Sequence, residues 1–435
     1  MHDSLHLVRT RRFLPIFVTQ FLGAFNDNLF RTAMVMLVIY GIYRDATQEA
    51  TFSAVAGGLF ILPFFLLSAL AGQLADSRDK AAIVRIVKNA EIVIMLAGAA
   101  GLLLHNIPLL LLALALMGVH STFFGPIKYA ILPQHLEEDE VLAGTGLVEA
   151  GTYIAILGGT LMGGVLVFQR ADGSFHAEWA AVAVLLVAAA GRVAGGYVPP
   201  AAPAKDAPTF HMDWHIVRAS IALVSATLHV RRLFLAIVAI SFFWAMGAVL
   251  AAQFPPLVKN SLGSNQTVAT LFLAIFSVGV AIGSIAVNRL LKGHVSARYS
   301  PASAIGMGLF VVDLFRRVEG FPVHAGALYG TREFLATSDG PWIVLDLLGV
   351  AISGGMFVVP LYAFLTTTVP KSETARTIAA NNIVNAGLMV AATVLLTLAV
   401  QAGVTVAQSL LIVALASLVA AWLGWKLHKA CDHSA

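Results

Sequence analysis

Long apolar stretches dominate the sequence and leave little choice of fold. Twelve of them follow one another, starting near residues 13, 52, 83, 108, 141, 177, 231, 267, 301, 342, 377 and 405. A helix needs about 20 apolar residues to cross the hydrocarbon core of a bilayer. Only 11% of the 435 residues are Asp, Glu, Lys or Arg, less than half of the roughly 25% found in soluble domains. The sequence therefore predicts an all-α membrane protein with twelve transmembrane helices.

Lysine and arginine residues gather on one side of this twelve-helix arrangement. If the N-terminus lies in the cytoplasm, nineteen of the 27 fall on the cytoplasmic side and six on the opposite side. The cytoplasmic count includes Arg85 and Lys88, near the start of the third stretch. Because cytoplasmic loops carry an excess of these cations, we expect both termini to be cytoplasmic.

The chain also carries signs of an internal duplication. Residues 123–132 resemble residues 357–365 once one residue is removed, and residues 147–151 resemble residues 383–387. The two matches occur in the same order and lie about half the chain apart, as expected for the internal repeats of transporters. We therefore expect two pseudo-symmetric six-helix bundles, residues 1–198 and 231–435, joined by a polar cytoplasmic linker at residues 199–230.

The loop after the second stretch has a recognisable pattern, which reads GQLADSRDK from Gly72 to Lys80. It resembles the loop signature of the major facilitator superfamily, with Asp79 where a glycine is usual. In this reading Gly72 allows close helix approach, Asp76 stabilises the adjoining helix N-terminus, and Arg78 holds the loop at the membrane surface. The alternative is an ordinary basic loop. Together with the twelve stretches and the repeat, the pattern predicts a two-bundle transporter of this superfamily, with Gly72, Asp76 and Arg78 in gating or structural roles.

The first apolar stretch contains charged residues at membrane depth. Asp27 lies 14 residues beyond Phe13, about 21 Å along a helix. Arg31 follows four residues later, on the same helical face, where it can pair with Asp27, and Asn28 adds an amide. Charges at this depth cost at least ~2.5–3.5 kcal/mol each on insertion scales. The alternatives are a structural ion pair and a polar patch that binds substrate, and we expect the patch.

Further polar residues occur in four of the other stretches. Lys128 follows Gly125 and Pro126, and either snorkels to the headgroups or lines the same patch. Glu149 lies in the glycine-rich fifth stretch, where a structural carboxylate is the alternative, and Glu91 in the third stretch is given no role. In the second half the polar residues deep in the stretches are amides. We expect Asn381, Asn382 and Asn385 to contribute to the substrate site.

Nothing in the sequence indicates catalysis. The 13 histidines show no metal-ligand spacing on a common helix, and neither a nucleophile with its base nor a phosphate-binding loop is present. We expect no enzyme activity, no cofactor, no metal site and no nucleic-acid partner.

Two motifs are similar to those of a known family. Residues 19–28 read TQFLGAFNDN, and residues 124–132 read FGPIKYAIL, followed by TGLVEA at residues 145–150. Both resemble bacterial lysophospholipid transporters of the major facilitator superfamily, especially the transporter module that some bacteria fuse to an acyltransferase and an acyl-carrier-protein ligase. In one departure, residues 245–253 lack the arginine that some family members carry there.

The resemblance implies a flippase of the bacterial inner membrane. It would move lysophosphatidylethanolamine-type lipids from the outer to the inner leaflet for reacylation, by alternating access. It places the family's Asp, Lys and Glu on Asp27, Lys128 and Glu149, and implies membrane lipids and a cytoplasmic acyltransferase or acyl-carrier-protein ligase as candidate partners. We expect Arg31 or Lys128 to meet the lipid phosphate, and Asp27 or Glu149 the amine.

Two other functions fit the same residues. A proton-coupled exporter of small amphiphilic molecules would use Asp27 or Glu149 as the titrating group, and it would stop when the proton gradient collapses. A scaffold that docks an acyltransferase would be indifferent to neutralisation of the intramembrane charges. Headgroup and chain-length preference, ion coupling, oligomeric state, conformational state and the role of the outer loop at residues 319–341 stay open.

Overall fold

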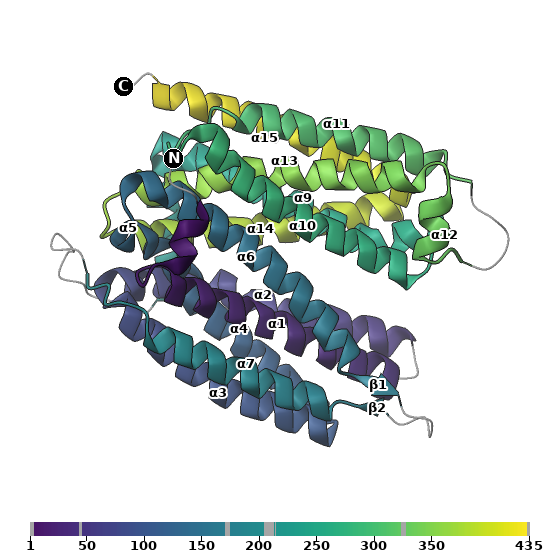
Figure 1. Cartoon of the computed structure of the whole chain (residues 1–435), viewed down its shortest axis with the longest axis horizontal. Coiled ribbons are helices and arrows are strands. Elements are labelled where there is room, and N and C mark those ends of the chain that lie inside the picture. Colours follow the sequence, from purple (N-terminus) through teal and green to yellow (C-terminus); the bar gives the residue numbers. More distant parts are fainter. Residues whose placement is uncertain are drawn as a thin grey trace. The chain divides into compact units, whose positions relative to one another are not determined.

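The computed structural model describes residues 4–42, 46–169, 175–203, 213, 215–322 and 328–432, and these are almost entirely helical (Figure 1). Twelve long helices lie within the described residues: α1 (Leu14–Met36), α2 (Ala46–Ser77), α3 (Lys80–Leu104), α4 (Ile107–Ala130), α6 (Glu138–Val165), α7 (Glu178–Gly196), α9 (Arg231–Pro256), α10 (Gln266–Leu291), α11 (Ser300–Glu319), α13 (Gly340–Thr367), α14 (Thr374–Gln401) and α15 (Val406–Asp432). They coincide with the twelve apolar stretches, which confirms the expected fold class.

Shorter elements precede or connect the long helices. They are η1 (Ser4–Arg9), η2 (Leu37–Ile42), α5 (Leu132–His135), the antiparallel pair β1 (Phe168–Gln169) and β2 (Phe175–His176), α8 (Ile216–His229), η3 (Leu257–Ser261) and α12 (Thr331–Ala336). Several long helices begin at a side chain that caps them. Asp79 accepts a hydrogen bond from the Ala81 amide at the start of α3, and Asn106 accepts one from Leu109 at the start of α4.

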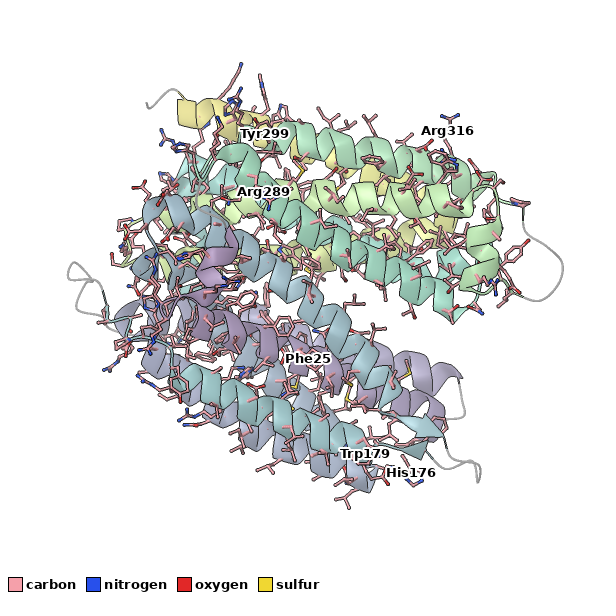
Figure 2. All side chains as sticks on the ribbon, in the orientation of Figure 1. Phe25, His176, Trp179, Arg289, Tyr299 and Arg316 are labelled. Atoms are coloured by element: carbon pink, nitrogen blue, oxygen red, sulfur yellow. The ribbon has the colours of Figure 1, made fainter. Side chains whose placement is uncertain are left out.

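Ten of the long helices are apolar and long enough to cross a membrane, counted over the described residues. The other two, α1 and α11, have the length but carry charged side chains such as Asp27 and Arg316. In Figure 2 the side chains along the middle of the helices are mostly carbon, whereas Tyr299 and Arg316 lie near opposite ends of α11. The chain is therefore a multi-pass membrane protein.

The helices divide into two compact units. The first comprises residues 1–144, 151–226 and 366–383, and the second comprises residues 145–150, 227–365 and 384–435. Each unit is thus built mainly from one half of the chain and includes a short stretch of the other half. The bundle boundaries expected at residues 198 and 231 stay predictions.

Close helix packing organises the first unit. α3 packs on α4 and α7, α2 packs on α4, and α1 packs on α7, around buried side chains that include Phe30, Met95 and Met117. Glycines of α6 let α1 approach its backbone. A Cβ atom on Gly159 would collide with the carbonyl oxygen of Phe25, so this position requires glycine.

Replacing Gly159 with alanine is therefore expected to destabilise the protein. Because the clash is with backbone, α1 has to move, and overpacking of this kind costs about 1–3 kcal/mol. Gly164, on the same helix, has no atom within 4 Å of an added Cβ, and alanine there should be neutral or slightly stabilising. Thermal unfolding of the two detergent-purified variants checks the prediction, and equal melting temperatures would contradict it.

The second unit uses similar packing. α15 packs against both α9 and α11, and α11 and α15 run side by side (Figure 1). α10 and α13 meet at glycines, because Cβ atoms on Gly283 and Gly355 would collide with the carbonyl oxygens of Ile352 and Val280. Small residues at helix contacts are how membrane helices reach backbone-to-backbone distance.

The linker contains a helix that the sequence analysis did not predict. Residues 204–212 and 214 lie outside the described residues, but α8 follows directly after them. Its Ala219 packs with Ala69 of α2 and Ile383 of α14, whereas Val217 and Ile221 are exposed. Just before α8, hydrogen bonds from the exposed Arg218 guanidinium hold the pKa of Asp213 below its usual value.

The loop at residues 319–341, which the sequence analysis placed on the outer side, is partly helical. Residues 323–327 lie outside the described residues, and α12 follows them with Phe334 fully buried. The Phe334 ring packs against Phe272 and Phe321, and the Asn265 amide donates to the Tyr329 carbonyl. These contacts attach the loop to the neighbouring end of α10 in the second unit.

Candidate functional site

Asp27 lies on the face of α1 that meets α4. Its side chain is half-buried and accepts a 2.7 Å hydrogen bond from the Ser121 hydroxyl of α4. A carboxylate that accepts one hydrogen bond keeps capacity for further donors. Asp27 is thus held in place by Ser121 and is only partly buried.

Arg31 does not pair with Asp27. Among the described residues no ion pair within 4.0 Å joins them; instead the Arg31 guanidinium donates to Asn28 Oδ1 at 2.9 Å and lies 5.8 Å from the centre of the Phe60 ring. The expected pairing across four residues is therefore wrong. Asn28, three residues before Arg31, accepts the hydrogen bond from the guanidinium, and Ser121 donates to the Asp27 carboxylate. Arg31 remains exposed beside Asp27.

Lys128 shares a face of α4 with Ser121. The two residues are seven positions apart, which is two helical turns or about 10 Å, and Gly125 lies between them on the same face. Lys128 is half-buried, and its Nζ lies 4.8 Å from the centre of the buried Tyr129 ring. Side chains on a helix tilt toward its N-terminus, which for Lys128 is the direction of Ser121.

An amide of α14 lies beside this face. A Cβ atom on Gly125 would lie 3.3 Å from Asn382 Nδ2, so glycine leaves the space that the amide uses. The first unit thus brings together three of the predicted site residues, Asp27, Lys128 and Asn382, along α4. Asn28 and Arg31 follow Asp27 on α1, where they are hydrogen-bonded to each other, and Asn381 is fully buried in α14.

The remaining predicted residues belong to the second unit. Glu149 is fully buried. Asn385 accepts a 2.6 Å hydrogen bond from Ser241, and its amide nitrogen lies 3.5 Å from the Tyr362 hydroxyl. Tyr362 in turn accepts a 2.7 Å hydrogen bond from the Trp244 indole. Asn385 is therefore part of a polar cluster that joins α9, α13 and α14.

The sequence analysis missed a buried charged cluster in the first unit. Lys88 and Glu91 of α3 are 0% and 1% exposed, and the Lys88 ammonium donates to Glu91 Oε2 at 2.6 Å. Glu91 Oε1 accepts from Asn26 Nδ2 at 2.9 Å, and Glu91 Oε2 lies 3.4 Å from His120 Nε2. The sequence analysis counted Lys88 only as a cation of the cytoplasmic side and gave Glu91 no role, whereas the structure buries both in one charge network.

Glycines leave space for the Lys88 side chain, and one aromatic ring packs against its ammonium. A Cβ atom on Gly23 would lie 2.9 Å from Lys88 Nζ, and Gly191 and Gly195 of α7 also border the lysine side chain. The Phe124 ring lies 5.4 Å from Nζ, within cation–π distance. The sequence contained one sign of this pair, the i,i+3 spacing of Lys88 and Glu91 inside an apolar stretch. That spacing does not show whether the pair faces the protein interior or the surface.

Asp76 caps a different helix from the one expected. Its carboxylate accepts hydrogen bonds from the Ala375 and Arg376 amides at 3.0 Å and from Arg376 Nε at 3.1 Å, at the start of α14. The adjoining helix α3 is capped by Asp79 instead. Gly72 allows the close approach, because a Cβ atom there would lie 2.6 Å from the Ala379 Cβ. The stretch from Gly72 to Ser77 is the last part of α2 rather than a loop, and Arg78 is exposed between the end of α2 and the start of α3.

Replacing Asp76 with alanine is expected to lower stability and transport together. The substitution leaves the first amides of α14 without their acceptor, and losing such a cap costs about 0.5–2 kcal/mol. Asp76→Asn keeps one acceptor oxygen and should fall between wild type and alanine. Ser77→Ala, which removes only a local bond to the Leu74 carbonyl, is the matched control. Melting temperatures that fall from wild type through Asp76→Asn to Asp76→Ala support the cap. An Asp76→Ala protein with the wild-type melting temperature would contradict it.

The described residues contain no group of three or more His, Cys, Asp or Glu side chains able to hold a metal ion. What the first unit offers is a row of hydrogen-bonding and charged groups on α1 and α4. One carboxylate (Asp27) and two cations (Arg31 and Lys128) at membrane depth can bind a ligand that carries a positive and a negative charge.

Comparisons with known proteins agree with this architecture. Residues 16–393 match the family model of the Major Facilitator Superfamily. The lysophospholipid transporter LplT of Citrobacter koseri is 28% identical over 411 residues, covering 93% of this chain and 94% of that protein, and LplT of Salmonella newport is 28% identical over 400 residues, covering 90% and 88%. These relatives carry transporter names, in agreement with the expectation that the chain is not an enzyme.

Solved structures share the fold. The human organic anion transporter MFSD10 (TETRAN) superposes with a TM-score of 0.76 at 13% identity, covering 95% of this chain and 99% of that one. The Escherichia coli fucose:proton symporter FucP superposes with a TM-score of 0.67 at 13% identity, covering 95% and 98%. With twelve membrane-length helices and a family match over most of its length, the chain belongs to the Major Facilitator Superfamily.

Proposed function

We propose that the chain transports lysophospholipids, and that it moves lysophosphatidylethanolamine-type lipids from the outer to the inner leaflet of the bacterial inner membrane. The similarity to transporters named for lysophospholipids, over about nine-tenths of both chains, supports the substrate class. The excess of Lys and Arg in alternate connections supports cytoplasmic termini. A cytoplasmic acyltransferase or acyl-carrier-protein ligase would consume the delivered lipid.

The observation that carries the proposal is the polar face of α4 and its neighbours. Asp27, held by Ser121, receives the headgroup ammonium, and Lys128 receives the phosphate from the other end of the face. Arg31 is a second cation for the phosphate, and Asn382 adds an amide beside Gly125. A zwitterionic headgroup can interact with both kinds of charge at once, whereas a neutral amphiphile offers a counter-charge to neither.

The acyl chain of the lysolipid has to stay out of water during transport. Each methylene group moved from hydrocarbon into water costs about 0.8 kcal/mol, so the tail stays in lipid or in an apolar groove while the headgroup moves along the site. Alternating access of the two halves, as in other transporters built from repeats, then exposes the headgroup site to one leaflet and then to the other.

Transport of labelled lysophosphatidylethanolamine into proteoliposomes tests the function. The label is placed in the outer leaflet, and the fraction that albumin can no longer extract is followed with time. Protein-dependent protection of the lysolipid, and none of diacyl phosphatidylethanolamine, is the expected result. Equal rates in liposomes with and without the protein would refute the proposal.

A further inference from the structure

Helix α8, in the last part of the linker, packs on two membrane-length helices. Its Ala219 lies in a small apolar cluster with Ala69 of α2 and Ile383 of α14. Just before α8, the Asp213 amide donates a hydrogen bond to Gln73 Oε1, which also belongs to α2, at 3.3 Å. These contacts hold α8 against α2 and α14 in the first unit.

The contacts of α8 lie well inside the ends of these two helices. α2 ends at Ser77, and Ala69 is eight residues before that end, about 12 Å along the helix. α14 begins at Thr374, and Ile383 is nine residues beyond that start, about 14 Å along the helix. The two ends lie together, because Asp76 accepts hydrogen bonds from the first amides of α14. α8 therefore meets both helices at a similar depth.

The lengths of α2 and α14 convert this depth into a position in a bilayer. α2 has 32 residues and α14 has 28, about 48 and 42 Å of helix. The hydrocarbon core is about 30 Å thick, so helices that project equally on both sides extend about 9 and 6 Å beyond it at each end. The contacts with α8 then lie roughly 3–8 Å inside the hydrocarbon, comparable to the ~5–10 Å at which interfacial helices are buried.

The sequence of α8 has the polarity of an interfacial helix. At about 100° per residue, four large apolar side chains form one stripe along it: Val217, Ile221, Val224 and Leu228. Val217 and Ile221 are 66% and 65% exposed. Exposed polar residues follow a line beside this stripe: Arg218, Ser225 and His229. Exposed apolar side chains bordered by polar ones mark a surface that binds a membrane or another protein.

Two features favour the membrane over a protein partner. The stripe lies on a helix that packs at hydrocarbon depth, where lipid is the surrounding medium and a water-soluble protein does not reach. α8 also continues almost directly into α9, which begins with Arg231 and Arg232. Cations at the end of a membrane helix bind the phosphates of the headgroup region, so these arginines fix the end of α8 at the membrane surface.

From this arrangement we propose that α8 is a membrane-binding helix, with its apolar stripe inserted among the acyl chains of one leaflet and its polar edge facing the headgroups. The leaflet is the one on the side where α2 ends and α14 begins, which the distribution of Lys and Arg predicts to be cytoplasmic. The linker is then not a wholly polar connection, because its last part belongs to the membrane-bound region of the protein. This role of α8 is independent of the transported molecule.

Fluorescence quenching at single cysteines tests the insertion. Cys431, the single cysteine of the chain, is replaced by serine, and Val217→Cys, Ile221→Cys or Ser225→Cys is labelled with bimane. Each protein is reconstituted in vesicles of phosphatidylethanolamine and phosphatidylglycerol. Labels at Val217 and Ile221 should be quenched by brominated acyl chains and shielded from iodide supplied on both sides. The label at Ser225, on the polar edge of the same helix, is the matched control and should show the opposite pattern.

A charge placed in the stripe provides a second measurement. Ile221→Glu in the labelled Val217→Cys protein should remove most of the quenching by brominated lipid and raise the quenching by iodide, because a carboxylate is costly in hydrocarbon. Ser225→Glu places the same charge on the polar edge and should leave the Val217 label unchanged. Thermal unfolding confirms that the compared proteins are folded.

Each possible outcome decides the role of α8. Iodide quenching at Val217 and Ile221 as strong as at Ser225 would place the stripe in water and overturn the proposal. Shielding of both labels from iodide and from brominated lipid would show that protein covers the stripe, from a second copy or another chain, and would overturn it as well. If Ile221→Glu does not fold, the three cysteine labels alone decide.

Discussion

Replacing Asp27 with alanine is expected to reduce lysolipid transport by about 30-fold or more. Removing one partner of a desolvated charge pair costs about 2 kcal/mol or more, and each 1.4 kcal/mol is a factor of ten. The folded protein should tolerate the change, because Asp27 is half-buried and its described hydrogen-bond partner is the Ser121 hydroxyl. Initial rates in proteoliposomes, compared at equal protein content, measure the effect.

Two companion variants show which property of Asp27 matters. Asp27→Asn keeps an acceptor for Ser121 and loses only the charge, so it should transport as poorly as the alanine variant. Ser121→Ala keeps the charge and loses one hydrogen bond, and it should retain far more activity. The idea of a headgroup carboxylate fails if Asp27→Asn transports at the wild-type rate.

Lys128 provides the complementary test at the other end of the α4 face. Lys128→Ala should impair every phosphate-bearing lysolipid, whereas Asp27→Asn should impair those with an ammonium most strongly. Lys128→Arg keeps the positive charge and should recover part of the rate. If wild-type rates persist in both Asp27→Ala and Lys128→Ala, these residues have no part in the transport path.

Breaking the Lys88–Glu91 pair is expected to cause the largest loss of stability. Glu91→Gln leaves a fully buried ammonium without its counter-ion, and uncompensated charges of this kind cost about 3–5 kcal/mol. Thermal unfolding in detergent should show a much lower melting temperature. The loss should exceed that of Arg218→Ala, which removes an exposed pair with Asp213.

A double variant separates charge from packing. Lys88→Met together with Glu91→Leu removes both charges and keeps similar volumes, and replacement of a buried pair by apolar residues is often neutral or stabilising. The double variant should therefore be more stable than either single variant. If the losses of the single variants simply add, the two side chains do not interact and the buried-pair interpretation is wrong.

Much of the architecture was predictable because it follows from local chemistry. Backbone groups in hydrocarbon must bond within the same helix, so each apolar stretch of about 20 residues became a long helix, including α1 with its charges. Helix α8 escaped prediction because it is short and lies among prolines and charges, where an amphipathic pattern is hard to tell from a polar linker.

The candidate site was predictable only as a set of residues. Asp27 and Lys128 stand out because charges are costly in an apolar stretch, and the structure places Lys128 on α4 and Asp27 in contact with Ser121 of the same helix. Their partners were not predictable. The i,i+4 spacing suggested that Arg31 would pair with Asp27, but Asn28 and Ser121 were closer in space.

The sequence by itself determined the twelve membrane-length helices and the unusual residues within them, because hydropathy and helix length act along the chain. Only the tertiary structure decided which of those residues meet. In the sequence Lys88 was one cation in a count of the cytoplasmic side, and the packing of α1, α3, α4 and α7 encloses it beside Glu91 and His120. Asp76 likewise faces the start of α14, some 300 residues away. Contacts between distant segments depend on how the helices are rotated and packed against one another. The spacing of residues along a single helix does not determine that rotation.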